Sequence, residues 1–127
     1  MVKVNGKDVE WKRAPNFVSN VQRQVLWKDE KTGATFAILK IPEGVYLEQV
    51  PHSHPHSNQF TFRLSGEIEL PNGTHIAVSE DDYGFDYCPK DKEHGAMSNG
   101  TKVLKDFVYL HYWDGPEDWN DTDKTDK

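Results

Sequence analysis

The chain has 127 residues and a mass of 14.6 kDa, enough for one domain with a hydrophobic core of its own. Its 15 basic and 21 acidic side chains give a net charge of −6, which argues against nucleic-acid binding. The apolar runs are too short to span a membrane, and residues 1–14 lack the apolar core of a signal peptide. The single cysteine, Cys88, has no partner for an internal disulfide or a zinc knuckle. These features predict a soluble cytoplasmic protein.

Short apolar or alternating segments, separated by turn residues, follow one another along the chain. In chain order they span residues 24–28, 34–41, 45–50, 60–64, 67–70, 75–78, 83–88 and 102–113. β-branched and aromatic residues dominate these segments, and none sustains the periodicity of an amphipathic helix. The pair Asn72 and Gly73 is typical of a hairpin turn, because both residues tolerate positive φ. Many short strands in one small domain predict a β-sandwich or a β-barrel.

Composition divides the chain into three parts. Residues 1–22 are expected to form an N-terminal arm and a first strand, and residues 23–113 the barrel. From Asp114 to Lys127, six acidic residues and two lysines occur without a hydrophobic pattern. This composition predicts a disordered acidic tail, which is more typical of a solvated end than of an interaction arm.

Three of the six histidines lie within five residues of one another, at His52, His54 and His56. In a strand, residues i and i+2 face the same side, so His52 and His54 can present their imidazoles to a common point. Neutral imidazole is the commonest ligand for transition-metal ions in proteins. The segment is therefore either a metal site, with His56 as an alternative ligand, or a solvated loop rich in histidine and serine.

The histidine segment belongs to a longer pattern. It reads His52-x-His54-x4-Gln59-x6-Gly66 and continues downstream with Gly84, Pro89 and His94. This pattern resembles the two-part signature of the cupin superfamily, and the resemblance covers about residues 24–118. It implies an all-β, RmlC-like jelly roll, or double-stranded β-helix, in which Gly66 opens a tight turn. Three positions depart from the signature. Asp91 stands in place of a glycine, Gln59 in place of the commoner glutamate, and Asn99 lies one place later than the asparagine of the family.

The resemblance also implies one divalent transition metal held by four side chains: His52, His54, Gln59 and His94. Iron(II) is favoured, and manganese, nickel, cobalt and zinc are compatible with the same ligands. Because three imidazoles and an amide are neutral, such a site keeps the full charge of the ion and favours a bidentate anionic or enolate ligand. Gln59 either coordinates the metal or only forms a hydrogen bond beside it.

Two groups of small cupins share further segments with this chain. Residues 24–39, 42–44, 83–85 and 113–119 resemble acetylacetone dioxygenases, which cleave a carbon–carbon bond of an enolised diketone, and the related anti-sigma-factor cupins. Residues 52–59 instead resemble cupins that act on ring-opened unsaturated uronates, although His111 stands where those have an aspartate. We therefore expect an iron dioxygenase acting on a small enolisable substrate. The alternatives are a redox-silent isomerase, tautomerase or cyclase, and a metal-binding sensor without catalysis.

Two further residues are candidates for contacts with the substrate. Arg63 lies on the same strand face as Gln59 and Thr61. It either points into the barrel, where it can bind an anionic substrate, or turns to solvent or into an internal ion pair. His111 lies in a run that is apolar on both faces. It is either an acid–base residue, a residue that supports the metal ligands, or a core histidine bonded to backbone.

The opposite face of this strand carries three large apolar side chains, Phe60, Phe62 and Leu64. Left exposed, they would form a large apolar stripe, so we expect a second sheet or a partner subunit to cover them, and we predict a homodimer. Tyr83, Phe85 and Tyr87 alternate on one face and are expected to pack in the core or to line a pocket. Cys88 is expected to be a buried thiol.

Overall fold

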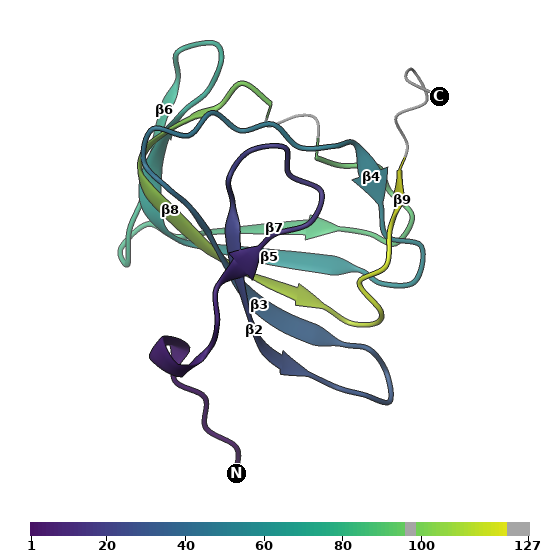
Figure 1. The fold of residues 1–127 in the computed structure, drawn as a ribbon. Coiled ribbons are helices and arrows are strands. Elements are labelled where there is room, and N and C mark those ends of the chain that lie inside the picture. The colour runs from purple at the N-terminus through teal and green to yellow at the C-terminus, as the bar shows by residue number, and fades with distance from the viewer. Residues whose placement is uncertain (96–98, 122–127) are drawn as a thin grey trace.

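The computed structural model describes residues 1–95 and 99–121, which form a jelly roll with almost no helix (Figure 1). One 3-10 turn, η1 (Gly6–Asp8), lies near the N-terminus. The strands are β1 (Lys12–Arg13), β2 (Gln22–Lys28), β3 (Thr35–Ile41), β4 (His52–Ser53), β5 (Gln59–Glu69), β6 (His75–Val78), β7 (Gly84–Cys88), β8 (Lys102–Trp113) and β9 (Asn120–Asp121). Within the described residues, no helix has the length and apolar character needed to cross a membrane.

The strands form one large antiparallel sheet and one small one. The large sheet runs in the order β1-β2-β3-β8-β5-β6, with β7 also paired to β5, and the small sheet consists of β4 and β9. Strands far apart in the sequence are neighbours in the order β3-β8-β5, as the crossovers of a jelly roll require. The large sheet curls so that β4 and β9 lie across the interior from it (Figure 1). The predicted fold class is therefore confirmed.

The predicted segments agree with the strands in most of the chain, and Gly66 accounts for one difference. Two predicted segments, 60–64 and 67–70, are a single strand, β5, and Gly66 lies inside it rather than at a turn. Its φ is +121°, and a Cβ there would lie 2.5 Å from the carbonyl oxygen of Asp106 on β8. A glycine therefore allows β8 to approach β5 closely at an irregularity in their register. Residues 45–50 contribute only isolated bridges, such as that between Tyr46 and Lys102.

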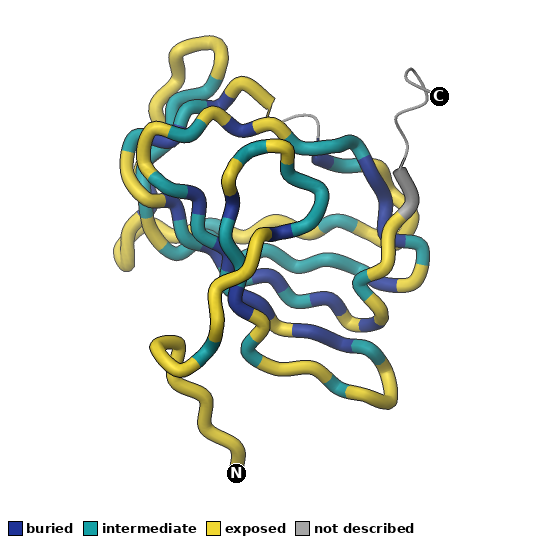
Figure 2. The backbone as a smooth tube through the Cα atoms, in the orientation of Figure 1, coloured by how far each residue is buried: buried dark blue, intermediate teal, exposed yellow. Residues whose placement is uncertain are grey.

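The core lies between the inner face of the large sheet and the segments that close the barrel. Side chains alternate along β3 and β8, so that every second residue is buried over most of both strands. The buried apolar side chains are chiefly Val21, Ala37, Leu39, Ile41, Leu47, Val103, Phe107, Tyr109 and Trp113. Figure 2 shows these buried stretches on strands whose connecting turns are exposed. The alternation that predicts strands also decides which residues face the interior.

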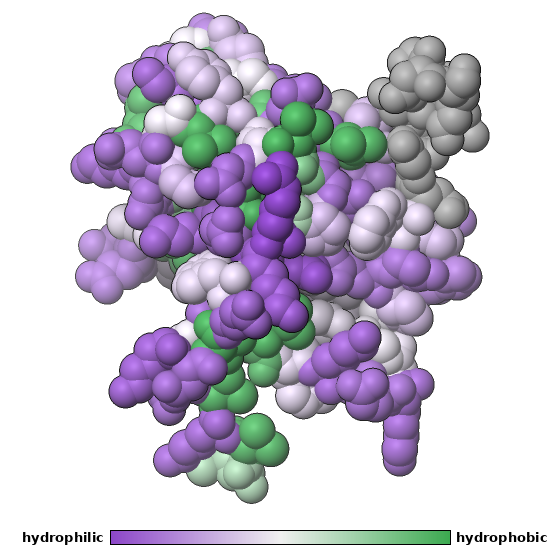
Figure 3. Space-filling model, viewed as in Figure 1, coloured by the Kyte–Doolittle hydropathy of each residue, from purple (hydrophilic) through white to green (hydrophobic). Residues whose placement is uncertain are grey.

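The outer face of the large sheet is rich in aromatic side chains. Phe60 packs against Phe85, Tyr87 and Tyr112 on this face. The side chains of β7 and the residue before it are not in the core, because Tyr83, Phe85 and Tyr87 are 60%, 56% and 52% exposed. Their expected core packing is therefore wrong, since their alternation places them on the outside of the barrel. The face of the molecule in Figure 3, by contrast, is mainly hydrophilic.

Candidate metal centre

Three histidines from two distant parts of the chain meet at one end of the barrel interior. His52 lies in β4 and His54 directly follows it, whereas His94 follows β7. His52 and His94 form an antiparallel bridge, in which the backbone N–H of each donates to the carbonyl oxygen of the other at 3.0 and 2.8 Å. One ring nitrogen of each of the three histidines lies within 4.8 Å of the others. These atoms are close enough to share one ion.

Backbone carbonyl groups orient the three rings. Each ring donates its Nδ1–H to a carbonyl oxygen: His52 to Val50 at 2.6 Å, His54 to Glu117 at 2.7 Å, and His94 to Lys92 at 3.2 Å. A carbonyl oxygen can only accept, so Nδ1 carries the proton and Nε2 presents a lone pair in each ring. The Nε2 atom of His94 is buried and has no hydrogen-bond partner within the described residues. Three converging imidazole lone pairs, one of them buried and unpaired, fit a divalent transition ion.

Burial and proximity keep His94 in the neutral form that a metal requires. Burial lowers the pKa of His94, the proximity of His54 lowers it further, and the carbonyl of Lys92 partly opposes them. Cys88 is half-buried, with Sγ 3.3 Å from Nδ1 of His94. Burial raises the pKa of the Cys88 thiol despite the opposing charge of Lys92.

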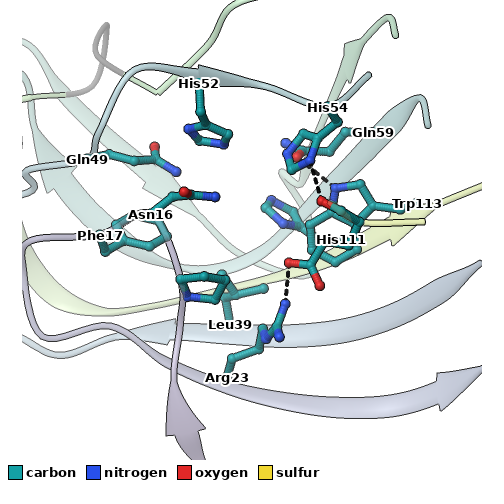
Figure 4. Close-up of a pocket in the computed structure, with 12 residues that line it drawn as sticks. Asn16, Phe17, Arg23, Leu39, Gln49, His52, His54, Gln59, His111 and Trp113 are labelled. Atoms are coloured by element: carbon teal, nitrogen blue, oxygen red, sulfur yellow. Dashed lines mark hydrogen bonds and ion pairs between the residues drawn. The ribbon is translucent and has the colours of Figure 1, made fainter. Parts of the chain in front are cut away.

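Gln59, at the start of β5, is fixed by a tryptophan. The indole Nε1–H of Trp113 donates to Oε1 of Gln59 at 2.9 Å. An indole nitrogen can only donate, so the amide oxygen must point toward Trp113, which leaves its second lone pair available. Gln59 lines a narrow cavity of about 20 Å³ together with His52 and His54 (Figure 4). That volume suits an ion or a water molecule but not a substrate.

His111, on β8, forms another wall of this narrow cavity (Figure 4). Its ring packs edge-on against Trp113, with ring centroids 4.9 Å apart. Burial, and to a smaller extent His94 and His54, lower the pKa of His111 to about 3, so the ring is neutral near pH 7. Its Nδ1 atom is buried and has no hydrogen-bond partner in the described part of the chain. His111 is thus a buried, neutral side chain beside the histidine cluster.

The segment after β8 holds the histidine motif in place. The Glu117 carbonyl that accepts from His54 belongs to a residue whose carboxylate forms an ion pair with Arg23 of β2. Strand β9 pairs with β4, so the backbone of residues 120–121 lies beside that of His52 and Ser53. Residues 114–121 therefore pack against the histidine motif, where their composition predicts disorder. The remainder of the predicted tail, 122–127, lies outside the described residues.

Two residues near the cluster differ from the sequence expectations. The side chain of His56 is largely exposed and binds the carboxylate of Asp118 at 2.9 Å, so it lies outside the histidine cluster. Asp91, which replaces a glycine of the motif, has a φ of +67°. Aspartate tolerates this left-handed conformation better than most residues, and the Asp91 N–H donates to the carbonyl oxygen of His54 at 2.9 Å. The turn is therefore kept without the glycine.

Arg63 lies away from the cluster, on the same inward face of β5 as Gln59 and Thr61. It lines a second cavity of about 310 Å³, which shares Phe17 and Gln49 with the narrow cavity beside the histidines. Its Nε lies 3.4 Å from Oδ2 of Asp86. Of the two sequence alternatives for Arg63, the structure thus combines an inward position with an ion pair.

Several residues that shape the site carry no signal in the sequence. The Glu117 carbonyl orients His54, but any residue provides a carbonyl oxygen, so the sequence does not reveal this role. Arg23 and Trp113 lie 94 and 54 residues from their partners Glu117 and Gln59. Only the pairing of β2, β3, β8 and β5 shows that they meet.

Comparisons with known proteins add information on the fold. No family model matches the sequence, and no curated protein matches it. An acetylacetone dioxygenase structure from Acinetobacter johnsonii is 22% identical, with a TM-score of 0.57 over 100% of this chain and 80% of that one. The polyketide cyclase RemF from Streptomyces resistomycificus is 16% identical, with a TM-score of 0.61 over 98% and 87% of the two chains. An RmlC-like cupin from Shewanella frigidimarina is 14% identical, with a TM-score of 0.59 over 97% and 92%.

Two of these similar structures belong to proteins with different activities, a dioxygenase and a cyclase. At such low identity the similarity establishes the fold, because one fold supports many reactions. The chain therefore has the cupin fold, as the motifs at residues 52–66 and 84–94 predict.

Proposed function

We propose that His52, His54, His94 and Gln59 bind one divalent transition metal. The observation that carries this proposal is the convergence of three imidazole rings, each with its Nδ1–H donated to a backbone carbonyl oxygen. Such outer hydrogen bonds fix the ring orientation and the tautomer of metal-binding histidines. Gln59 is proposed as a fourth, neutral ligand, because Trp113 holds its amide oxygen while leaving a lone pair on it.

We propose further that the protein is an enzyme and that its substrate is a small enolisable dicarbonyl or keto compound. An iron(II) ion at the site would supply Lewis acidity toward substrate oxygens and redox chemistry with dioxygen. The four neutral ligands support binding of an anionic enolate, because they do not offset the charge of the ion. Carbon–carbon bond cleavage by a dioxygenase is the favoured reaction. The similarity to an acetylacetone dioxygenase over the whole chain supports it.

Two side chains are proposed to contact the substrate. His111 is buried beside the histidines, and its Nδ1 atom has no hydrogen-bond partner among the residues that the structure describes. Because its pKa is lowered to about 3, we assign it a neutral hydrogen bond to a substrate oxygen and not the role of a base that becomes charged. Arg63 lines the adjoining cavity and is proposed to bind an anionic part of the substrate.

A redox-silent isomerase or cyclase is the second candidate. Its support is the similarity to a polyketide cyclase, whose TM-score of 0.61 is comparable to that of the dioxygenase. The same donor set with zinc or another redox-silent ion would stabilise an enolate without consuming oxygen. A metal-binding sensor without catalysis is the third candidate and would bind the ion without turning over any substrate.

Oxygen uptake separates these functions. The iron-reconstituted protein is incubated with a panel of β-diketones and α-hydroxyketones, and dissolved oxygen and products are measured together. The dioxygenase predicts stoichiometric oxygen consumption with carbon–carbon cleavage, and His94→Ala serves as the control that lacks a ligand. Turnover of an enolisable acid under strict anaerobiosis, with no oxygen consumed by any substrate, would instead favour the isomerase or cyclase. Metal binding with no turnover at all would favour the sensor.

We also propose that the chain forms a homodimer through the outer face of its large sheet. Trp27, Phe36, Phe85 and Tyr87 are exposed there, a combination that monomeric proteins rarely leave uncovered. Light scattering coupled to gel filtration is expected to give twice the chain mass, and Phe85→Lys is expected to shift the protein toward the monomer. A wild-type monomer at micromolar concentration would contradict the proposal.

A further inference from the structure

The cavity that Arg63 lines is large enough for a small organic molecule. Its volume is about 310 Å³, at the lower end of the range for ligand sites. Most of its wall is apolar, with Ile41, Leu47, Ile68, Leu70 and Phe107 among the lining residues. It adjoins the narrow cavity beside the histidines through Phe17 and Gln49, which line both. The cavity therefore suits a ligand with an apolar body and lies next to the histidine end.

Two buried polar atoms on the cavity wall make no hydrogen bond within the described residues. Nε of Arg63 is buried and makes no hydrogen bond within the described residues. Oγ1 of Thr101 is also buried and unpaired there, and the residue is only 1% exposed. A buried donor without an acceptor is costly, and a guanidinium is satisfied best by a carboxylate. Both groups therefore favour a ligand that brings oxygen atoms to this wall.

Asp86 does not fulfil this need. Its Oδ2 atom lies 3.4 Å from Nε of Arg63, without the geometry of a hydrogen bond, and its side chain is 62% exposed. An exposed carboxylate at this distance is screened by water and contributes little. It neutralises part of the charge of Arg63 from one side. The terminal nitrogens of the guanidinium then remain available to a second carboxylate.

Gly84 makes room for the guanidinium. Gly84 is the register partner of Arg63 on the neighbouring strand β7. A Cβ at position 84 would lie 2.5 Å from both Cζ and Nε of Arg63, which is closer than atoms can approach. The φ angle of Gly84 is not in the left-handed region, so the backbone conformation does not require a glycine here. Because Gly84 has no side chain, the guanidinium of Arg63 can occupy the space beside it.

We infer that Arg63 binds a carboxylate, and that the substrate is an oxo-carboxylic acid with an apolar chain. The carbonyl end of this substrate rests on the proposed function, whereas the carboxylate end rests on Arg63 and the cavity. Gln59 and Arg63 are four residues apart along β5, so their Cα atoms lie about 13 Å apart. A ligand that reaches from Arg63 to the proposed metal has to span about this distance.

The carboxylate subsite can be tested on metal-free protein, where the proposed metal chemistry plays no part. Octanoate, methyl octanoate and 1-octanol are titrated into the wild-type protein by calorimetry. Octanoate is expected to bind at least about tenfold more tightly than the ester or the alcohol, because only the acid forms a charged hydrogen bond with Arg63. Equal binding of all three compounds would overturn the inference.

Variants then test whether Arg63 is responsible for the affinity for octanoate. Arg63→Gln is expected to abolish the preference for octanoate, and Gly84→Ala to weaken it by displacing the guanidinium. Arg63→Lys is used if Arg63→Gln does not fold. Lysine keeps the charge but lacks the planar pair of donors, so it is expected to lower octanoate affinity severalfold. Lys105→Gln, on the outer surface, is the matched control and is expected to leave binding unchanged. Unchanged octanoate binding in folded Arg63→Gln, or in Arg63→Lys if Arg63→Gln does not fold, would overturn the assignment.

The two proposals fail separately. Oxygen-dependent turnover of β-diketones without any preference for carboxylates would overturn the subsite and leave the proposed enzyme intact. Octanoate binding through Arg63 without any turnover would support the subsite and contradict the proposed enzyme.

Discussion

The histidine end and the Arg63 end of the barrel interior differ in how their polar atoms are satisfied. At the histidine end, three backbone carbonyls accept the ring N–H groups, so lone pairs converge on one point. At the other end, a guanidinium nitrogen and a threonine hydroxyl are buried without hydrogen-bond partners in residues 1–95 and 99–121. The first arrangement is complementary to a cation and the second to an anion. The comparison teaches that one barrel interior can present opposite chemistry at two places, with Gln59 and Arg63 of β5 marking one place each.

The largest expected effect comes from removing one histidine, which should weaken metal binding and leave octanoate binding unchanged. His94→Ala is expected to weaken the binding of divalent metal by more than about 100-fold, which exceeds the usual effect of losing an outer hydrogen bond. The same variant should bind octanoate as the wild type does, because Arg63 is untouched. Titration of both ligands into each variant measures this. Equal metal affinity in His94→Ala and the wild type would remove the basis for distinguishing the two ends.

The ion pair between Arg23 and Glu117 is expected to have the next largest effect. It is largely buried and ties β2 to the segment whose carbonyl orients His54. Arg23→Gln is expected to lower the free energy of unfolding by about 1–3 kcal/mol, because Glu117 is left without its partner. Metal affinity should fall about tenfold through loss of the His54 hydrogen bond. Chemical denaturation and metal titration check both effects. Lys105→Gln, which breaks an exposed pair with Glu67, should change neither.

The low pKa of His111 predicts how stability depends on pH. Its pKa is about 3 in the folded protein and has the ordinary value near 6.5 in the unfolded chain. Between these values the unfolded chain binds a proton that the folded protein does not, so stability is lost as the pH falls from 6.5 toward 3. Chemical denaturation of the metal-free wild type and of His111→Phe at several pH values measures this. In the variant, the unfolding free energy should fall less steeply with decreasing pH, by a slope that corresponds to about one proton fewer taken up on unfolding. Parallel profiles would show that His111 titrates normally.

Gln59 is expected to have the smallest effect, because a neutral amide is a weak ligand. Gln59→Ala should lower metal affinity only severalfold, whereas Gln59→Glu should raise it by adding a negative charge beside the ion. Trp113 fluorescence provides a second measurement, since the indole loses its acceptor in the alanine variant. If Gln59→Ala and Gln59→Glu both bind metal as the wild type does, Gln59 has only a positioning role.

Short stretches of sequence are enough to predict the fold and the clustered histidines, because strand alternation and the spacing of His52 and His54 are local patterns. Alternation along residues 102–113 identifies β8, and the spacing of His52 and His54 identifies two of the clustered rings. The same alternation does not tell the inside of the barrel from the outside, so Tyr83 and Phe85 were expected in the core and lie on the surface. Composition predicts disorder after residue 114, but pairing of β9 with β4 depends on long-range contacts. The proposed carboxylate subsite also cannot be predicted from the sequence, because only the register of β5 and β7 shows that Gly84 lies opposite Arg63.

A crystal structure of the metal-loaded protein, with anomalous scattering recorded at the absorption edge of the metal, tests the metal centre most directly. The expected result is one peak per chain, bonded at about 2.0–2.2 Å to Nε2 of His52, His54 and His94, with Oε1 of Gln59 as a further ligand. Each Nδ1 should remain bonded to its backbone carbonyl. A peak bonded through Nδ1, a peak elsewhere in the molecule, or no peak under metal-saturating conditions would contradict the assignment of these three histidines.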